Sequence, residues 1–376
     1  MALRVLVVDD TVTYRKIISD ALEGIPGIEV VGTASNGKTA LARIQALHPD
    51  VATLDIEMPE MNGLEVLQAV RAQGIELGVV MVSAFTRRGS ELTIRALELG
   101  AFDFITKAEE GGIEQNRQRI QNALAPLLKA YAHKLEIRSI LKGTTNPSLL
   151  QAKPAPVAPP PAATRPVVVE PARVETAEAQ KVDLSSVSQR MQKMSGKFHP
   201  EMVLVGISTG GPNALAQVIP KLPGNLGVPV LIVQHMPALF TRTLAESLDK
   251  QSALKVKEAE HSETALPNTV YIAPGGKQMK VTPGIDGKPT IQISDDPPEN
   301  NCRPSADTLF RSAAHNFPGR TCAVIMTGMG SDGTLGLRLI KRFPTWVIAQ
   351  NEASCVVFWH AQGSHCRRCG GCGLSP

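Results

Sequence analysis

Three residues with the chemistry of ester and amide cleavage follow apolar runs in the second half of the sequence. Ser208 follows Met202–Ile207, His235 ends a second run, and Asp332 lies shortly after a third. A serine oxygen attacks an acyl carbon when a histidine takes its proton and a carboxylate stabilises the imidazolium that forms. These residue types predict a serine hydrolase with Ser208 as nucleophile, His235 as general base and Asp332 as the residue that orients the base.

The turn around Ser208 has the composition of an abrupt strand-to-helix junction. Gly206, Gly210 and Gly211 allow a tight backbone turn, and Pro212 suits the first turn of a helix, where its missing N–H is not needed. Free N–H groups at a helix N-terminus favour an alkoxide-like nucleophile or a neighbouring oxyanion. Glycine-rich turns of this kind also bind phosphate groups, so the motif alone leaves both functions open.

The three apolar runs are expected to be strands of an open parallel sheet. They span Met202–Ile207, Val228–Gln234 and Thr321–Thr327, and a helical pattern follows the first. Because ligands of such sheets bind outside the carboxyl ends of the strands, residues far apart in sequence can meet there. The chain order of Ser, His and Asp differs from that of α/β-hydrolases, so the sequence predicts a doubly wound α/β domain of another kind.

A second set of reactive side chains follows predicted strands in the first half of the sequence. Asp9, Asp10 and Asp55 are carboxylates at strand ends, and Ser83 and Lys107 follow two further strands. Neighbouring carboxylates repel one another and call for a cation, and hard oxygen ligands suit Mg²⁺. A carboxylate can also accept a phosphoryl group whose charge a metal and a lysine neutralise. The alternative is that these aspartates only cap helices and form turns.

The elements around these side chains alternate between strand and helix patterns. Helices are expected near Val12, Lys38, Gly63 and Gly89, and from Ile113 onward. The alternation predicts a flavodoxin-like five-stranded parallel sheet with helices on both faces. The predicted strands are Arg4–Val8, Ile28–Gly32, Val51–Leu54, Gly78–Val82 and Phe102–Ile105.

Length and composition indicate a two-domain protein without a membrane span. The chain has 376 residues, a formal net charge of +4 and six cysteines, too few for a disulfide framework. It has no long basic run and no uninterrupted apolar span, and it opens on a strand instead of a signal peptide. We therefore expect a cytoplasmic protein that neither binds nucleic acid nor inserts into a membrane.

Composition also sets the expected domain boundaries. The last helix of the first domain is expected to run from Asn116 to Lys142, and residues 152–173 are rich in proline and alanine, as in a semi-rigid linker. A DNA-binding output domain is disfavoured because the C-terminal half alternates between strands and helices. The expected units are a first domain at 1–127, a helical extension and linker at 128–198, a catalytic domain at 199–358 and a divergent tail at 359–376.

The tail contains residues of metal-binding types. His360, His365, Cys366, Cys369 and Cys372 are zinc ligands by type, but their spacing matches no usual zinc module. We favour a divergent tail without a defined metal site.

Several blocks of the second domain resemble the catalytic domain of chemotaxis protein-glutamate methylesterases, the CheB family. The resemblance implies hydrolysis of glutamate methyl esters on chemoreceptors and, in many members, deamidation of receptor glutamines, with no cofactor. By position, Ser208, His235 and Asp332 match the family's triad, and Met329 matches the residue whose backbone N–H helps to bind the oxyanion. The blocks are Gly206-Ile-Ser-Thr-Gly-Gly-Pro212, Gln234-His-Met-Pro237, Tyr271-Ile-Ala-Pro-Gly-Gly276, Arg303-Pro-Ser-Ala-Asp307, Thr327-Gly-Met-Gly-Ser-Asp-Gly333 and Gln350-Asn-Glu-Ala-Ser-Cys355.

The first domain resembles a response-regulator receiver domain. By that resemblance Asp55 is the phosphoacceptor, and Asp10, Asp55 and the backbone carbonyl of Glu57 would hold Mg²⁺, with Asp9 completing the acidic pair. Ser83 and Lys107 would contact the phosphoryl group, and Phe104 matches the aromatic switch position. The pattern consists of Val7-Val-Asp-Asp10, Asp55-Ile-Glu-Met-Pro59, Ser83-Ala84, Phe104 and Lys107.

Together the two resemblances imply a cytoplasmic, monomeric esterase whose receiver restrains it until Asp55 is phosphorylated. A chemotaxis histidine kinase would be the phosphodonor and methyl-accepting chemoreceptors the substrates. Family elements expected after Phe358 are missing, so we expect a C-terminally incomplete catalytic domain. The alternative function is a non-enzymatic response regulator that acts as a phosphate sink or adaptor.

Overall fold

The computed structural model describes residues 2–107, 111–141, 199–352, 354–357 and 373–374. Most of the predicted linker and nearly all of the tail lie outside these residues. The possible zinc ligands His360, His365, Cys366, Cys369 and Cys372 therefore also lie outside the described part, and the prediction about them stays a prediction.

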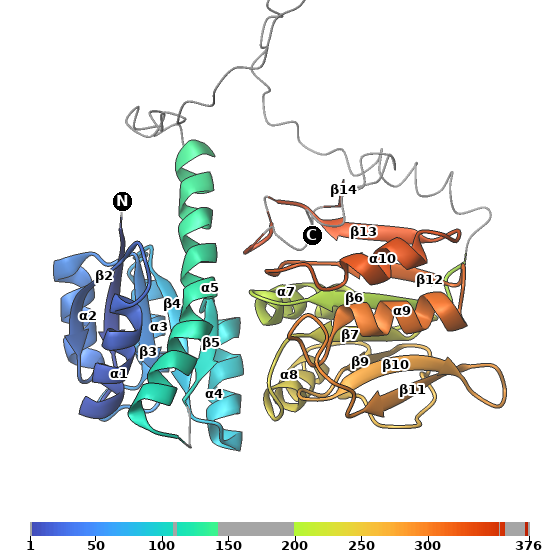
Figure 1. Cartoon of the computed structure of the whole chain (residues 1–376), viewed down its shortest axis with the longest axis horizontal. Helices are drawn as coiled ribbons and strands as arrows, with labels where there is room; N and C mark the ends of the chain where they lie inside the picture. The colour runs from blue at the N-terminus through green and yellow to red at the C-terminus, as the bar shows by residue number, and fades with distance from the viewer. Residues whose placement is uncertain (1, 108–110, 142–198, 353, 358–372, 375–376) are drawn as a thin grey trace, which may run out of the picture. The chain divides into compact units, whose positions relative to one another are not determined.

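The first domain is built on a five-stranded parallel sheet with the strand order β2-β1-β3-β4-β5 (Figure 1). All neighbouring strands pair in parallel, as predicted. The two strands β3 and β4 are buried along their whole length, because helices cover both faces of the sheet. The strands are β1 Leu3–Val8, β2 Ile28–Ala34, β3 Val51–Asp55, β4 Gly78–Ser83 and β5 Asp103–Thr106.

Five helices flank this sheet in two layers. Helices α2, α3 and α4 contact one another in succession on one face. On the other face, the Gln121 side chain of α5 donates a hydrogen bond to the carbonyl of Gly24 at the end of α1. The helices are α1 Val12–Glu23, α2 Gly37–Leu47, α3 Gly63–Ala72, α4 Arg87–Glu98 and α5 Ile113–Leu141.

The second domain has a parallel sheet with the order β14-β13-β12-β6-β7-β9-β8. The three predicted strands appear as β6, β7 and β12, and they are direct neighbours in the sheet. After β6 the chain forms β7, β8 and β9 on one side of β6. It then crosses back to form β12 and β13 on the other side of β6. The strands are β6 Met202–Ile207, β7 Val230–Gln234, β8 Lys255–Glu258, β9 Thr269–Ile272, β12 Thr321–Ile325, β13 Trp346–Gln350 and β14 Gly373–Leu374.

Helices cover both faces of this sheet, as the doubly wound prediction requires. Helices α7 Gly211–Val218 and α8 Phe240–Asp249 contact each other on one face, and α9 Ala306–Asn316 and α10 Thr334–Ile340 pack together on the other (Figure 1). An antiparallel hairpin of β10 Gln278–Pro283 and β11 Pro289–Ser294 packs against α9. The direction of winding reverses between β6 and β12, and in sheets of this kind ligands bind outside the carboxyl ends of the strands at such a point.

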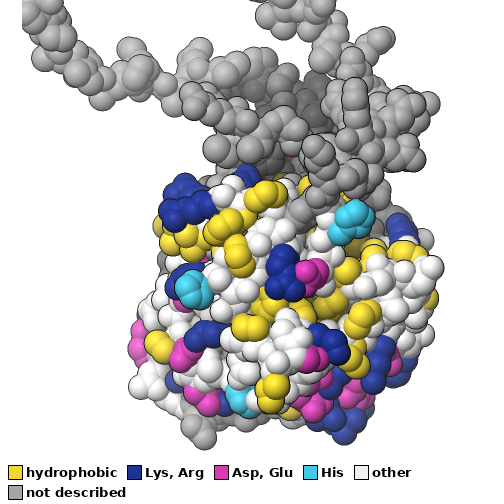
Figure 2. Space-filling view, turned by 90° about the vertical axis from the view of Figure 1, so that its right-hand side faces the viewer, with side chains coloured by type: hydrophobic (Ala, Val, Ile, Leu, Met, Phe, Trp, Pro, Cys, Tyr) yellow, Lys and Arg dark blue, Asp and Glu magenta, His cyan; other side chains and the backbone are white. Residues whose placement is uncertain are grey.

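The surface is mixed in charge where it can be seen. Figure 2 shows one face on which Lys and Arg side chains lie next to Asp and Glu side chains, with hydrophobic side chains between them. Among the helices of the described residues, none combines the length and apolar character needed to cross a bilayer.

Candidate active site

Ser208 lies in the tight turn between β6 and α7. Its backbone N–H donates to the carbonyl of Thr327, 3.0 Å away, and its own carbonyl accepts from Gly211 at 2.7 Å. The turn requires Gly210 in a left-handed conformation, with φ of 73°, and Pro212 lies in the first turn of α7. Gly210 and Pro212 therefore have the roles that the sequence predicted.

Gly211 is required for a different reason, because the side chain of Gln234 fills the space beside it. A Cβ at position 211 would overlap the Gln234 side-chain oxygen. The Gln234 amide in turn donates to the carbonyl of Ser208 at 3.0 Å. The end of β7 thus holds the serine turn in place.

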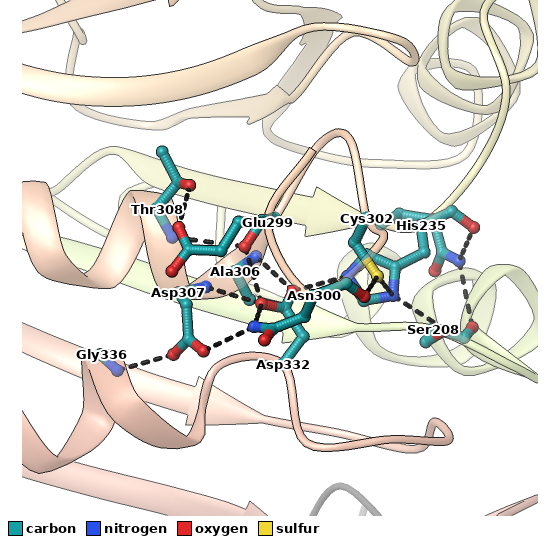
Figure 3. A network of polar contacts seen from close by, with 12 residues as sticks. Ser208, His235, Glu299, Asn300, Cys302, Ala306, Asp307, Thr308, Asp332 and Gly336 are labelled. Atoms are coloured by element: carbon teal, nitrogen blue, oxygen red, sulfur yellow. Dashed lines mark hydrogen bonds and ion pairs between the residues drawn. The ribbon is translucent and has the colours of Figure 1, made fainter. Parts of the chain in front are cut away.

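Ser208, His235 and Asp332 form one chain of hydrogen bonds across the carboxyl ends of β6, β7 and β12 (Figure 3). His235 Nδ1 lies 3.1 Å from Ser208 Oγ, and His235 Nε2 lies 2.8 Å from Asp332 Oδ2. When Nε2 carries the proton and donates it to Asp332, the Nδ1 lone pair faces the serine hydroxyl and can accept its proton. The structure thus brings together the three side chains that the sequence selected.

Asp332 is held by the N-terminus of α9. Its carboxylate accepts hydrogen bonds from the Ser305 hydroxyl at 2.7 Å, from the Ala306 N–H at 2.6 Å and from the Asp307 N–H at 3.2 Å. The Asn300 amide donates a further bond at 3.1 Å. Free N–H groups and the positive end of the helix dipole favour a carboxylate at this position.

Electrostatics in this chain favour an ionised Asp332 and a protonated imidazole. Burial opposes ionisation of Asp332, but hydrogen bonds from His235, Ser305 and Ala306 outweigh it and hold the pKa of its carboxyl below the ordinary value. Burial also opposes the charged form of His235, yet contacts with Asp332 and Cys302 raise the pKa of this imidazole to about 9. The surroundings therefore stabilise the imidazolium that forms when His235 takes a proton from Ser208.

Asp307 connects this network to the next helix. One of its carboxylate oxygens accepts from the backbone N–H of Gly336 in α10 at 2.6 Å, and the other accepts from Asn300 at 3.0 Å. Burial, together with the neighbouring Asp332 charge, raises the pKa of Asp307, while the Gly336 N–H favours its ionised form. The loop that carries Asp332 and the start of α9 are thereby joined through shared hydrogen bonds.

Asn300, Ser305 and Asp307 have no function that could be assigned from the sequence. Ser305 and Asp307 belong to one of the sequence blocks noted above, and a serine before a helical run is a typical helix cap. That they surround Asp332 is visible only in three dimensions. Met329, the proposed oxyanion residue, lies half-buried in the loop between β12 and Asp332.

The acidic side chains of the first domain meet Lys107 at the carboxyl edge of its sheet. Lys107 Nζ lies 2.9 Å from Asp9 Oδ2 and 2.7 Å from Asp55 Oδ2. Asp9 and Asp55 are buried, and Asp10, the second residue after β1, is half-buried. Asp9 also accepts hydrogen bonds from the N–H and hydroxyl of Thr11, at 2.9 and 2.6 Å. The predicted cluster is therefore formed by side chains from different strand ends.

The surroundings adjust the pKa values of this cluster. Burial raises the pKa of the Asp55 carboxyl to about 6, although the Lys107 ammonium beside it favours the ionised form. Burial opposes the charged form of Lys107, but Asp55 and Asp9 outweigh this and raise the pKa of its ammonium group. Removing the lysine would thus leave two buried carboxylates without their cation.

The remaining predicted residues of this domain lie near the same edge. Ser83 ends β4, where its hydroxyl accepts a hydrogen bond from Thr93 at 2.8 Å. Phe104 lies in β5 opposite Met81 and is partly exposed. Glu57 lies two residues after the end of β3, and its side chain pairs with Arg88 on the surface.

The donor set of the cluster suits a hard divalent cation. Carboxylate oxygens of Asp9, Asp10 and Asp55 lie within 4.8 Å of one another. Asp9 Oδ2 is buried and accepts no hydrogen bond, although it lies close to the Lys107 ammonium. A buried carboxylate oxygen in this situation has capacity for a metal ion, and an all-oxygen site is typical for Mg²⁺. The cluster is of the type found at Mg²⁺ sites in receiver domains.

The first α/β domain has an acidic cluster around a lysine, as a response regulator does. The second has a linked serine, histidine and aspartate, as a serine hydrolase does. The fold and the two sites therefore define a response regulator joined to a serine-hydrolase domain. The comparisons with known proteins agree. Residues 5–118 match the family model of the response regulator receiver domain, and residues 203–363 match that of the CheB methylesterase.

Similar proteins extend over nearly the whole chain. A protein-glutamate methylesterase/protein-glutamine glutaminase from Desulfotalea psychrophila is 48% identical over 95% of this chain and 90% of its own. A protein of the same name from Bacillus subtilis is 42% identical, with the same coverage. The crystal structure of the Thermotoga maritima CheB methylesterase catalytic domain, at 42% identity and a TM-score of 0.43, covers 44% of this chain and 87% of that one. The chain belongs to the CheB family of protein-glutamate methylesterases/protein-glutamine glutaminases.

Proposed function

We propose that this chain hydrolyses glutamate methyl esters and glutamine amides in chemoreceptors through Ser208, His235 and Asp332. The observation that carries the proposal is the continuous hydrogen-bonded chain Ser208–His235–Asp332 at the switch point of the sheet. The relatives' names support the substrate class. The alternative of a non-enzymatic response regulator gains no support from the described catalytic domain, because Ser208, His235 and Asp332 are all present there and linked by hydrogen bonds.

The proposed reaction proceeds through an acyl-enzyme. Ser208 Oγ attacks the ester carbon while its proton passes to His235 Nδ1, and Asp332 stabilises the imidazolium through Nε2. The tetrahedral oxyanion would be bound by the backbone N–H of Met329, with the N-terminus of α7 favouring the negative charge. Collapse expels methanol, or ammonia from an amide, which takes the proton from His235. Water then cleaves the acyl-serine with His235 again as base and leaves a glutamate side chain.

The first domain is proposed to control this activity. Asp55 would accept a phosphoryl group from a chemotaxis histidine kinase, with Lys107 and Ser83 contacting the phosphoryl oxygens and Phe104 responding to the change. Asp10, Asp55 and the Glu57 carbonyl would hold Mg²⁺, with Asp9 beside them, and the ion would neutralise charge on the phosphoryl oxygens. The esterase reaction itself is proposed to need no cofactor.

We propose domain boundaries at 1–127 and 199–358, with an extension and linker at 128–198 and a divergent tail at 359–376. The protein is proposed to act in the cytoplasm as a monomer, with methyl-accepting chemoreceptors and the kinase as partners, without nucleic acid and without insertion into the membrane.

The decisive experiment measures methanol release from methylated chemoreceptor, with Mg²⁺, with and without a small phosphodonor. The wild-type chain should release methanol, and the rate should rise with phosphodonor. Ser208→Ala should abolish release while it still becomes phosphorylated. The matched control is Ser252→Ala, a serine three residues after α8 whose hydroxyl donates to the carbonyl of Leu248. Undiminished release by Ser208→Ala would refute the nucleophile, and no release by a soluble, phosphorylatable wild-type chain would refute the activity.

A further inference from the structure

A half-exposed thiol lies beside the imidazole of the Ser208–His235–Asp332 chain. Cys302 Sγ is 3.7 Å from His235 Nδ1 and 3.4 Å from the carbonyl oxygen of Asn300. The nitrogen it faces is the one that also faces Ser208 Oγ (Figure 3). The proposed reaction does not use this sulfur.

Sulfur and imidazole nitrogen form a donor pair that binds borderline and soft cations. Thiolate and imidazole are the preferred ligands of Zn²⁺, with bond lengths of about 2.3 Å to sulfur and about 2.0 Å to nitrogen. At a tetrahedral angle these lengths separate sulfur from nitrogen by about 3.5 Å. The observed separation of 3.7 Å is therefore close to the spacing of two ligands on one zinc ion.

The rest of the site already supports the imidazole as a ligand. Metal-binding histidines typically donate their second ring N–H to a carboxylate, which fixes the tautomer. Asp332 accepts that bond from His235 Nε2 at 2.8 Å and is itself held by α9, so the Nδ1 lone pair points away from Asp332. The same preorganisation that serves a general base thus serves a metal ligand.

We propose that His235 Nδ1 and Cys302 Sγ bind Zn²⁺ or a similarly thiophilic cation, which blocks hydrolysis. On binding, the thiol proton of Cys302 and the Nδ1 proton of a protonated His235 both pass to solvent, and the metal takes the Nδ1 lone pair that would otherwise accept the Ser208 proton. Ser208 Oγ, 3.1 Å from Nδ1, or water molecules complete the coordination. Two protein ligands make an open, reversible site, distinct in donor type from the all-oxygen cluster of the first domain.

Only the inhibitory part of this inference rests on the proposed function. Cation binding is measured without activity, by the thiolate-to-metal charge-transfer absorption of Cd²⁺, a band that carboxylate sites do not produce. Because Cys366, Cys369 and Cys372 would contribute their own signal, all variants are made in a full-length background in which these three are serine, alongside the wild-type chain. Cys302→Ser and Cys302→Ala are compared with Cys355→Ser, a matched half-buried cysteine.

In this background the Cd²⁺ band should appear at one equivalent, persist in Cys355→Ser and disappear in both Cys302 variants. In the methanol assay, Zn²⁺ should inhibit reversibly with EDTA. The Zn²⁺ concentration for half-inhibition should rise at least about tenfold in the Cys302 variants, each compared with its own metal-free rate, since even loss of an outer partner costs about 10–100-fold in affinity. The proposal is overturned if the Cys302 variants show the same Cd²⁺ band, or the same sensitivity to Zn²⁺, as the background that retains the Cys302 thiol. If no variant hydrolyses the ester, the proposed function is refuted, and the Cd²⁺ band still tests whether Cys302 binds the metal.

Discussion

At the scale of single residues, Asp332 carries the most interactions of the proposed triad. It accepts hydrogen bonds from His235, from a serine hydroxyl, from an amide and from two backbone N–H groups of α9. Five donors fix both carboxylate oxygens, so the imidazole of His235 receives one orientation and one tautomer. The position of the base is thus determined by residues that do not themselves contact Ser208.

This arrangement makes Asp332→Asn a sharp test of the proposed roles. The asparagine amide can donate an N–H to His235 Nε2, and this hydrogen bond favours the tautomer that carries its proton on Nδ1. A protonated Nδ1 can no longer accept the proton of Ser208. We expect kcat for methanol release to fall about 10³–10⁴-fold, the size of effect that a wrong tautomer has in serine proteases, with little change in KM. Thermal unfolding checks that the variant is folded, and a kcat within tenfold of the wild type would contradict the role of Asp332.

The residues of the triad could be predicted because each follows an apolar run at a strand's carboxyl end. Ser208 also lies in a turn whose glycines and proline are informative by themselves. The supporting residues could not be found in this way, because Asn300 and Ser305 reach Asp332 across 32 and 27 positions of sequence. The role of Met329 stays a prediction.

At the scale of secondary structure, the N-terminus of α9 has two functions at once. The Ser305 hydroxyl accepts the N–H of Thr308 as a helix cap and donates to Asp332. We expect Ser305→Ala to lower the free energy of unfolding by about 1 kcal/mol through loss of the cap. It should also lower kcat about tenfold, because hydrogen bonds to charged groups are worth about 1.5–3 kcal/mol.

Ser305→Thr separates these effects from general damage, since threonine keeps the hydroxyl. Thermal unfolding and steady-state methanol release are measured for both variants. A threonine variant as slow as the alanine variant would show that the hydroxyl does not position Asp332.

The serine turn provides a second test at this scale. Gly211→Ala places a methyl group against Gln234, which itself holds the carbonyl of Ser208. Overpacking of this kind costs about 1–3 kcal/mol, so we expect a lower midpoint of thermal unfolding and a reduced kcat. Gly224→Ala is the matched control, because its Cβ would meet Ala253 at an ordinary contact distance of 3.4 Å. Equal stability of the two variants would contradict the proposed packing of the turn.

The strands that the sequence predicted are those with long apolar runs. For all five strands of the first domain and for β6, β7 and β12 of the second, every predicted end lies within two residues of the observed end. The short strand β8 Lys255–Glu258 alternates charged residues with one valine, and β10 and β11 form a hairpin outside the main sheet, so periodicity did not identify them. The order of strands in a sheet depends on pairing between segments that are distant in sequence. It therefore could not be predicted from any single apolar run.

At the scale of the whole molecule, the two domains follow the same structural rule. Each places its reactive polar residues at the carboxyl edge of a parallel sheet whose strands are otherwise apolar. In one domain the edge gathers carboxylates around Lys107, and in the other it gathers a nucleophile and a base. One chain therefore contains a site suited to phosphoryl chemistry and a site suited to acyl transfer.

If the first site controls the second, loss of the phosphoacceptor must remove the response without touching the triad. Asp55→Asn keeps the size of the side chain but removes the carboxylate that would attack the phosphodonor, and it leaves Lys107 paired with Asp9. We expect methanol release by this variant to be the same with and without phosphodonor, whereas Asp20→Asn, an aspartate on α1 paired with Lys16, should respond as the wild type does. Full stimulation of Asp55→Asn would place the phosphoryl group on another residue and would separate the regulation of this esterase from its acidic pocket.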